Sequence, residues 1–291
     1  MTTTLTSLHR SRDAVEPALR KAVERLDPAS RAYASYHLGW TDADGQAVAG
    51  NGGKAVRPAL ALLSAEAAGA PAECGLAGAV AVELVHNFSL LHDDLMDGDV
   101  ERRHRPTVWA RWGASAAILT GDALLALAQE VLLDCPSPHA TAPGRLLACA
   151  TRDLIRGQVE DLAFEKRNDV TVEQCLNMAA AKTGALLSAS TSIGAVLAGA
   201  EADVVDALTM FGAHIGLAFQ LVDDLLGIWG DPVSTGKSIF SDLRSRKKSL
   251  PVTYALSQGG PAARELASWL ANPDAVDEDD LRRAADLVAD A

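Results

Sequence analysis

The chain has 291 residues, of which 48% are hydrophobic and 4% aromatic, and its formal net charge is −12 at pH 7. This length allows one large domain or two small ones. A net charge of this sign disfavours nucleic acid as a partner. The sequence holds no run of 18 uncharged apolar residues, so we expect no membrane span. Residues 1–26 carry charged side chains throughout and lack an apolar signal core, so we expect a cytoplasmic protein.

Alanine, leucine, glutamate and arginine are abundant and β-branched runs are few, so the composition predicts an all-α protein with closely packed helices. In chain order, helical patterns cover residues 5–26, 54–69, 74–99, 114–133, 145–167, 171–199, 202–229, 247–257, 261–270 and 277–289. Glycine, proline, asparagine and aspartate gather at residues 41–53, 134–144 and 230–242, where we expect loops. Long helices of this kind suggest a bundle whose interior can hold a ligand. We expect a single domain over residues 1–291.

The four cysteines, Cys74, Cys135, Cys149 and Cys175, show no C-x-x-C spacing. We therefore expect buried thiols that form neither a zinc site nor a disulfide framework.

Two acidic clusters interrupt stretches that otherwise resemble buried helix. They are Asp93-Asp94-Leu-Met-Asp97 and, about 130 residues later, Asp223-Asp224. On a helix the first three carboxylates lie near one face and repel one another, so they become favourable when a hard cation lies between them. Oxygen ligands favour Mg2+ or Mn2+ over zinc. The alternative is that each Asp-Asp pair is solvated surface or a helix cap, which the apolar flanking residues disfavour.

Basic residues stand close to the acidic ones. Arg102, Arg103 and Arg105 follow the first cluster within a few positions. This order suits a phosphate ester that metal ions bridge and whose remaining oxygens arginine contacts. A solvated surface explains it less well.

Three further motifs carry charge at unusual places. In Gly52-Gly-Lys-x-x-Arg-Pro58, Lys54 and Arg57 are three positions apart at a helix start and can reach one anion, although a solvated helix start is the alternative. The spacing is not that of a P-loop. His86 lies two helical turns before the first acidic cluster, where a core histidine is the alternative. Lys182 interrupts an alanine-rich run and needs an anionic partner if it is buried.

These motifs together resemble the trans-isoprenyl diphosphate synthases, and most closely the actinobacterial geranylgeranyl diphosphate synthases. The residues that carry the resemblance are, in chain order, Gly52-Gly-Lys-x-x-Arg-Pro58, His86, Asp93-Asp-Leu-Met-Asp97, Arg102-Arg103, Gly157-Gln-x-x-Asp161, Lys182-Thr183, Phe219-Gln-x-x-Asp-Asp224, Gly230-Asp231, Gly236-Lys237 and Lys247.

The resemblance implies an all-α isoprenoid synthase-type bundle of long antiparallel helices around a central cavity, usually as a homodimer. It implies two substrates, isopentenyl diphosphate and an allylic diphosphate, and Mg2+ as cofactor, most often three ions, with Mn2+ able to substitute. The implied metal ligands are Asp93, Asp94, Asp97 and Asp223. The implied contacts to the allylic diphosphate are Arg102, Lys182 and Lys237, and those to isopentenyl diphosphate are Lys54, Arg57, His86 and Arg103. Thr183 and Gln220 would face the allylic cation.

Product length is expected to depend on the helix that carries Asp93. Ser89 lies one turn deeper on the same face as Asp93, where a small side chain lets a growing chain pass. Phe88 lies one position further back and can close the tunnel, although ordinary core packing is the alternative. In the family this arrangement resembles the C20 enzymes, so we expect geranylgeranyl diphosphate as the main product.

Two departures from the family pattern stand out. The usual second motif ends in a third aspartate, where this chain has Gly227. The chain also ends at Ala291, where relatives often continue, so we expect either a shortened form or a reduced C-terminal cover. Two other functions stay open: a class I terpene cyclase, which the second-substrate residues disfavour, and a non-catalytic partner subunit, which the intact first cluster disfavours.

Overall fold

The computed structural model describes residues 2–48, 53, 55–139, 141–231, 239–272 and 276–291, and of residues 2–7 only the backbone. The chain forms two compact units. Unit 1 comprises Met1–Thr151 and Leu186–Gly212, and unit 2 comprises Arg152–Ala185 and Ala213–Ala291. The expected single domain stays a prediction, and each unit is described by itself.

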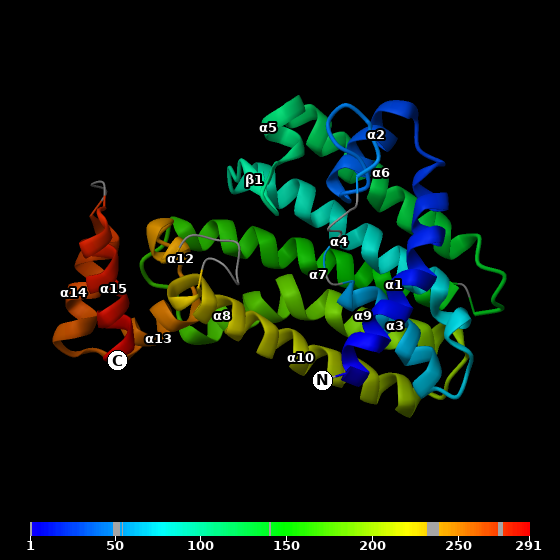
Figure 1. Ribbon diagram of the computed structural model, residues 1–291. Coiled ribbons are helices and arrows are strands. Elements are labelled where there is room, and N and C mark those ends of the chain that lie inside the picture. Colours follow the sequence, from blue (N-terminus) through cyan, green and yellow to red (C-terminus); the bar gives the residue numbers. More distant parts are fainter. Residues whose placement is uncertain (1, 49–52, 54, 140, 232–238, 273–275) are drawn as a thin grey trace. The chain divides into compact units, whose positions relative to one another are not determined.

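Unit 1 is built from helices and one short hairpin, which Figure 1 labels. Its elements are α1 (Thr2–Val23), α2 (Pro28–His37), α3 (Val56–Ala67), the 3-10 helix η1 (Ala72–Gly75), α4 (Leu76–Met96), β1 (Glu101–Arg102), β2 (Arg105–Pro106), α5 (Val108–Trp112), α6 (Ala114–Leu133), the first part of α7 (Thr141–Glu165), most of α9 (Ala185–Leu197) and the first part of α10 (Ala202–Trp229).

Unit 2 contains the remainder of α7 and α10 together with the C-terminal helices. Its other elements are α8 (Val172–Ala179), the π-helix η2 (Ala180–Gly184), α12 (Ser241–Arg244), α13 (Leu250–Gln258), α14 (Gly260–Ala271) and α15 (Glu278–Ala289). The all-α class expected from composition is therefore confirmed.

Local sequence signals explain where several helices begin. Asp27 caps α2 by accepting hydrogen bonds from the backbone N–H groups of Ala29 and Ser30, and a proline occupies the first turn. Thr171 and Gln174 form a capping box at α8. Without such caps, the first N–H groups of each helix would lack partners.

The predicted helix boundaries are confirmed at α6 and α10, which cover residues 114–133 and 202–229. Three short helices, α2, α5 and α12, and the β1–β2 hairpin were not predicted. The helix expected over residues 171–199 is interrupted by the π-turn of η2. Such turns leave no clear mark in hydrophobic periodicity, because the flanking helices keep their own pattern.

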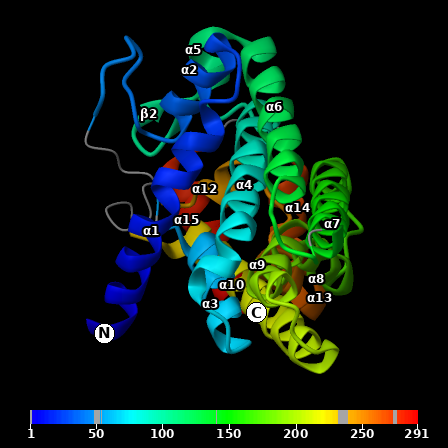
Figure 2. The same ribbon diagram turned by 90° about the vertical axis from the view of Figure 1, so that its right-hand side faces the viewer.

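Close helix packing in unit 1 depends on small residues. Helix α4 packs mainly on α6 and α3, and these helices lie side by side in Figures 1 and 2. A Cβ atom on Gly194 of α9 would lie 2.0 Å from the carbonyl oxygen of Ala61 in α3. A Cβ atom on Gly121 of α6 would lie 2.3 Å from the imidazole of His92 in α4. These glycines let one helix contact the next without a spacer.

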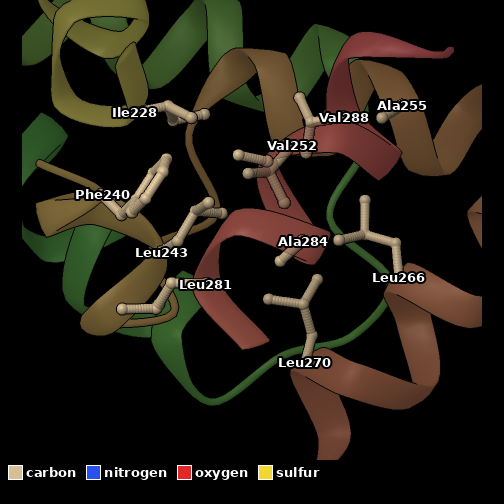
Figure 3. Close-up of a cluster of buried hydrophobic side chains, with 11 residues drawn as sticks. Ile228, Phe240, Leu243, Val252, Ala255, Leu266, Leu270, Leu281, Ala284 and Val288 are labelled. Atoms are coloured by element: carbon tan, nitrogen blue, oxygen red, sulfur yellow. The ribbon is translucent and has the colours of Figure 1, made fainter. Parts of the chain in front are cut away.

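A hydrophobic cluster organises the C-terminal part of unit 2 (Figure 3). It joins the end of α10 to α12, α13, α14 and α15. Its buried members are Ile228, Phe240, Leu243, Val252, Ala255, Leu266, Leu270, Leu281, Ala284, Ala285 and Val288. The cluster fixes α12 against the last turn of α10, which becomes important for the site.

One expectation from composition was wrong, and a second concerns membrane spans. Only Cys175 is buried, whereas Cys74 and Cys149 are exposed and Cys135 is intermediate, so the prediction of four buried thiols was wrong. Three helical stretches reach the length and apolar composition of a membrane span: 72–96, α6 and α10. Within the first, 72% of the most apolar window is buried inside the protein. A buried core helix has the same apolar composition as a membrane span, which accounts for this first stretch.

Replacing Gly194 with alanine should destabilise the protein. The new methyl group would overlap a backbone carbonyl of α3, which cannot rotate away, so we expect a loss of about 1–3 kcal/mol in the free energy of unfolding. Chemical denaturation measures it. Gly144→Ala in α7 is the matched control, because its nearest atom is 3.9 Å away and alanine favours a helix by about 0.5–1 kcal/mol. Equal stability of the two variants would contradict the packing argument.

Candidate functional site

The first acidic cluster lies at the C-terminal end of α4. Asp93 is half-buried, Asp94 is buried with 1% of its surface exposed, and Asp97 is exposed and forms the C-cap. Asp94 Oδ1 accepts a hydrogen bond from Arg102 Nε at 2.7 Å, and Arg102 Nη2 completes the ion pair at 2.6 Å from the same oxygen. Burial raises the pKa of Asp94, and Arg102 opposes this. Its other oxygen, Oδ2, is buried and has no hydrogen-bond partner among the described residues.

The β1–β2 hairpin holds Arg102 beside this carboxylate. Its two turn residues, Arg103 and His104, both have positive φ angles, 54° and 61°. Positive φ angles are uncommon outside glycine, and arginine, unlike histidine, is not among the residues that favour them, so the turn is strained at Arg103. Arg105 offsets the strain by donating to the carbonyl oxygens of Tyr36 at 3.3 Å and Thr41 at 2.8 Å. An Arg-His turn gives no glycine signal, which is why sequence reasoning missed the hairpin.

Three of the residues predicted to bind isopentenyl diphosphate belong to the described part of unit 1. Arg57 Nη1 lies 3.4 Å from His86 Nε2. The guanidinium of Arg103 lies on the backbone of Gly53, where a Cβ atom would come within 2.9 Å of Nη2. Burial, followed by the charges of Arg57, Arg103 and Arg102, holds the pKa of His86 well below its usual value, so the imidazole is neutral. We call Arg57, His86, Arg102 and Arg103 the cationic cluster.

Residues that the sequence did not single out support the cationic cluster. Glu83 is buried on α4 and accepts a hydrogen bond from Asn87 Nδ2 at 3.1 Å. Burial raises the pKa of Glu83, while the positive charge of Arg57 lowers it. His37 has a pKa of about 3, through burial and then the charges of Arg102 and Arg103, so it adds no further positive charge. Glu83 lies three residues before His86, and charge within an apolar helix was the signal that could have revealed it.

A small cavity of about 50 Å3 adjoins the hairpin. It is lined by Asp94, Arg102, Arg103, Arg105, His37 and neighbouring residues. Three guanidinium groups around so small a space provide donors for anionic oxygens.

In unit 2, Lys182 has the anionic partner that its position demanded. Its Nζ lies 2.6 Å from Asp161 Oδ2 of α7, and both side chains are mostly buried. A Cβ atom on Gly157 would lie 2.3 Å from the backbone nitrogen of Lys182, so the glycine lets α7 approach η2. Both amide atoms of Gln158 are buried without a hydrogen-bond partner among the described residues. The Gly157-to-Asp161 motif and Lys182 are thus brought together.

Thr183 and Gln220 begin a hydrogen-bond chain that ends at the second acidic cluster. Thr183 Oγ1 donates to Gln220 Oε1 at 2.6 Å, and Gln220 Nε2 donates to Asp224 Oδ1 at 2.7 Å. The other oxygen of Asp224 accepts from the backbone N–H of Leu250 at 2.9 Å. Asp224 is therefore buried and satisfied at both oxygens, whereas Asp223 is half-buried. This agrees with placing Asp223, and not Asp224, among the expected metal ligands.

Lys247 occupies a strongly negative environment in the same unit. Burial favours a lower pKa, but the carboxylates of Asp161, Asp242, Asp224 and Asp223 raise the pKa of Lys247 above its usual value. Lys247 was recognised only as part of the motif order, without a role. Its contacts make it the fixed positive charge next to the second acidic cluster.

The two residues expected to control product length differ in their surroundings. Ser89 is buried and donates its hydroxyl to the carbonyl oxygen of His86 at 2.8 Å. The ring of Phe88 packs edge-on against His92, with ring centroids 4.9 Å apart, and His92 Nε2 lies 3.0 Å from the carbonyl oxygen of Ile118 in α6. Phe88 therefore lies in the α4–α6 contact, about 140° around the helix from Asp93.

Two predicted phosphate ligands, Lys54 and Lys237, lie outside the described residues. Within the described ranges, no three histidine, cysteine, aspartate or glutamate side chains come together as a ready-made metal site. The donors nevertheless fit a hard cation, because they are carboxylate oxygens and one of them, Asp94 Oδ2, is buried without a partner. Mg2+ suits such a set, since it keeps several waters and takes other ligands from substrate phosphates. The metal assignments of Asp93, Asp94, Asp97 and Asp223 stay predictions.

Comparison with known proteins agrees with this geometry. The chain is 57% identical over 288 residues to the (2E,6E)-farnesyl diphosphate synthase of Mycobacterium tuberculosis strain H37Rv, covering 98% of this chain and 80% of that protein. It is 46% identical over 285 residues to the geranylgeranyl diphosphate synthase of the same strain, covering 97% of this chain and 81% of that protein.

A solved structure extends the likeness to the fold. The crystal structure of polyprenyl synthetase from Streptomyces coelicolor A3(2) matches with a TM-score of 0.94 and 55% sequence identity, over 98% of this chain and 87% of that chain. This confirms the all-α isoprenoid synthase fold expected from the motifs. The sequence pattern of the polyprenyl synthetase family matches residues 40–288, and the chain belongs to that family.

Proposed function

We propose that this protein is a Mg2+-dependent trans-prenyltransferase that condenses isopentenyl diphosphate with an allylic diphosphate, with geranylgeranyl diphosphate as its main product. Synthesis of trans-prenyl diphosphates is the function that its family and its relatives share. The observation that carries the proposal is the cationic cluster, in which Arg57 contacts His86 and Arg103 lies on Gly53. A second diphosphate needs such a cluster, whereas a terpene cyclase, which has one diphosphate substrate, does not.

Arg57, His86 and Arg103 of the cationic cluster are suited to hold the diphosphate that does not react, whereas Arg102 is assigned to the allylic diphosphate. Arginine donates paired hydrogen bonds to phosphate oxygens, and a neutral His86 can donate one more. In unit 1 these groups belong to the same compact body as Asp94, which Arg102 already neutralises. Binding of its diphosphate to these residues positions the alkene of isopentenyl diphosphate. The residues themselves take no part in cleavage of the carbon–oxygen bond.

Ionisation of the allylic diphosphate requires charge stabilisation at the leaving group. Bound Mg2+ would supply most of it, since it neutralises the negative charge that grows as the carbon–oxygen bond breaks. We assign Asp93, Asp94 and Asp97 of unit 1 and Asp223 of unit 2 as Mg2+ ligands, and Lys182 as a contact to the departing diphosphate. Thr183 and Gln220, held by their hydrogen bond, present oxygen atoms that favour the allylic cation. The alkene then attacks the cation, and a proton leaves to the departing diphosphate.

The choice of C20 rests on Ser89, because its small side chain shares the Asp93 face of α4 and leaves the chain room to extend. The 57% identical relative is a farnesyl (C15) enzyme and the 46% identical relative a geranylgeranyl (C20) enzyme, so product length must be measured. The homodimer, the cytoplasmic location and the number of metal ions likewise stay predictions.

One assay tests the function. The protein is incubated with farnesyl or dimethylallyl diphosphate, labelled isopentenyl diphosphate and Mg2+, and the products are identified. Longer prenyl diphosphates support the proposal, hydrocarbons indicate a cyclase, and no turnover indicates a non-catalytic subunit.

The two aspartates of the second cluster should respond differently to substitution. Asp223→Asn should lower kcat by about a hundredfold or more, because it removes a metal ligand. Asp224→Asn should lower the free energy of unfolding by about 1–3 kcal/mol, because an amide cannot accept from both Gln220 and the Leu250 N–H. Steady-state kinetics and thermal denaturation of the metal-free proteins measure these effects. A drop in kcat of similar size for both variants, without a stability difference, would show that Asp224 also binds metal.

Arg57 and Lys182 should separate the two substrates kinetically. Arg57→Lys loses the guanidinium fork and should raise KM for isopentenyl diphosphate by about tenfold with little change in kcat. Lys182→Gln keeps a donor for Asp161 but loses the charge, so it should mainly lower kcat. Lys166→Ala, an exposed lysine of unit 2, is the control. The reverse pattern would mean that the two subsites have been exchanged.

Product length should change with the residues before Asp93. Ser89→Phe should shorten the main product to C15, since a ring would fill the space one turn below Asp93. Phe88→Ala should lengthen it past C20 if this ring closes the tunnel. Mass spectrometry of the products decides both. Leu84→Ala, which removes an equally buried side chain of α4, controls for simple loss of packing. A wild-type product of C15, or no change in either variant, would contradict the assignment.

A further inference from the structure

We propose that Asp242 supplies the outer carboxylate of the second acidic cluster, at the place on α10 that Gly227 leaves open. The inference rests on the proposed function, because it concerns how this cluster holds Mg2+. It gives a role to an aspartate that the sequence motifs did not assign.

The two acidic clusters of this chain differ at one position. The first has carboxylates at Asp93 and, one helical turn later, at Asp97. In the second, the residue one helical turn after Asp223 is Gly227, which has no carboxylate. Residues four apart lie on the same helix face, so the second cluster lacks the outer carboxylate that the first one has.

The structure fills this place from another segment. A Cβ atom built on Gly227 would lie 2.4 Å from Cγ, 2.4 Å from Oδ2 and 2.5 Å from Oδ1 of Asp242. These distances are far inside van der Waals contact, so the carboxylate of Asp242 occupies the space where a side chain at position 227 would begin. Any larger residue at 227 would displace it. The glycine is thus required by the approach of Asp242.

The segment that carries Asp242 is fixed on the end of α10. The N–H of Phe240 donates to the carbonyl oxygen of Ile228 at 3.3 Å, and Ser241 Oγ donates to that of Gly227 at 3.2 Å. Phe240 and Leu243 are buried in the cluster that includes Ile228, as Figure 3 shows. Asp242 itself is only 8% exposed. Its carboxylate therefore has a defined position, as a metal-binding group requires.

Asp242 lies beside the helix position one turn after Asp223. Position 227 shares a face of α10 with Asp223, and the carboxylate of Asp242 occupies the place of its side chain. Asp224 already uses its two oxygens for Gln220 and Leu250. Asp223 and Asp242 are thus the two carboxylates of this cluster at the positions that Asp93 and Asp97 occupy in the first. Mg2+ keeps part of its hydration shell, so an outer carboxylate can act by accepting hydrogen bonds from metal-bound water.

The competing explanation is that Asp242 only balances the charge of Lys247. The two explanations differ in their effect on metal binding. If Asp242 acts on the metal site, Asp242→Asn should weaken metal binding, and the reciprocal exchange Gly227→Asp with Asp242→Gly should restore the affinity that Asp242→Gly loses. If Asp242 only balances Lys247, Asp242→Asn should lower the melting temperature of the metal-free protein and leave metal affinity unchanged.

The experiment measures binding of Mn2+, as a paramagnetic stand-in for Mg2+, in the presence of inorganic diphosphate by electron paramagnetic resonance. The proteins are wild type, Asp242→Asn, Asp242→Gly, Gly227→Asp and the double exchange. Asp169→Asn is the control, since Asp169 is an exposed aspartate of unit 2 paired with Arg167 at 2.8 Å. The melting temperature of each metal-free protein is the second readout.

Asp242→Asn should weaken Mn2+ binding about tenfold or more while the isosteric amide keeps the fold. Gly227→Asp alone should lower the metal-free melting temperature, because its side chain collides with Asp242. The double exchange should recover both the melting temperature and Mn2+ affinity. Unchanged affinity in Asp242→Asn, or a folded double variant that binds no better than Asp242→Gly, would overturn the proposal. Failure of the wild type to bind Mn2+ or to form prenyl diphosphate would overturn the proposed function as well, which the wild-type assay shows separately.

Discussion

A buried carboxylate must be neutralised or hydrogen-bonded, and this requirement shapes both acidic clusters. In the first, Asp94 accepts a hydrogen bond from Arg102 and forms an ion pair with it. In the second, Asp224 accepts one from Gln220 and one from the backbone of Leu250. Each cluster thus uses its second aspartate to hold a neighbouring element, the β1–β2 hairpin in one unit and the start of α13 in the other. The adjacent aspartates, Asp93 and Asp223, point in another direction because consecutive helix residues are rotated by about 100°.

The cationic cluster illustrates the opposite problem. Arg57, Arg102 and Arg103 repel one another in a poorly solvated place, and burial and this repulsion both lower the pKa of Arg103. The protein limits the repulsion in two ways: the histidines among them stay neutral, and the carboxyl groups of Glu83 and Asp94 lie close to the guanidinium groups. Two carboxylates do not balance three guanidinium groups. An incoming diphosphate removes the imbalance, so its binding gains from repulsion already present in the free protein.

The sequence was sufficient for most helices and for the type of site, but not for how its parts are held. Apolar periodicity located α6 and α10, because long helices with one buried face carry a strong repeating signal. The need of Lys182 for an anion was predictable, and Asp161 satisfies it. The hairpin at Arg103 and His104 was not predictable, because its turn contains no glycine, contradicts the backbone preference of arginine and is stabilised by tertiary contacts of Arg105. From the sequence, Gly227 looked like a missing metal ligand. A sequence motif shows only the side chains of one helix and not those that approach that helix from other segments.

The π-turn at η2 shows how a local irregularity serves the chemistry. Lys182 and Thr183 are neighbours in sequence, yet the first pairs with Asp161 of α7 and the second with Gln220 of α10. The backbone of η2 comes so close to α7 that only glycine fits at position 157. An ordinary helical turn would continue the hydrogen-bonding pattern of α8 into α9, whereas the wider turn inserts a residue and changes which side chains face each neighbour. The geometry of η2 thus sets the positions of a buried cation and a hydroxyl together, and the ion pair to Asp161 compensates for burying that cation.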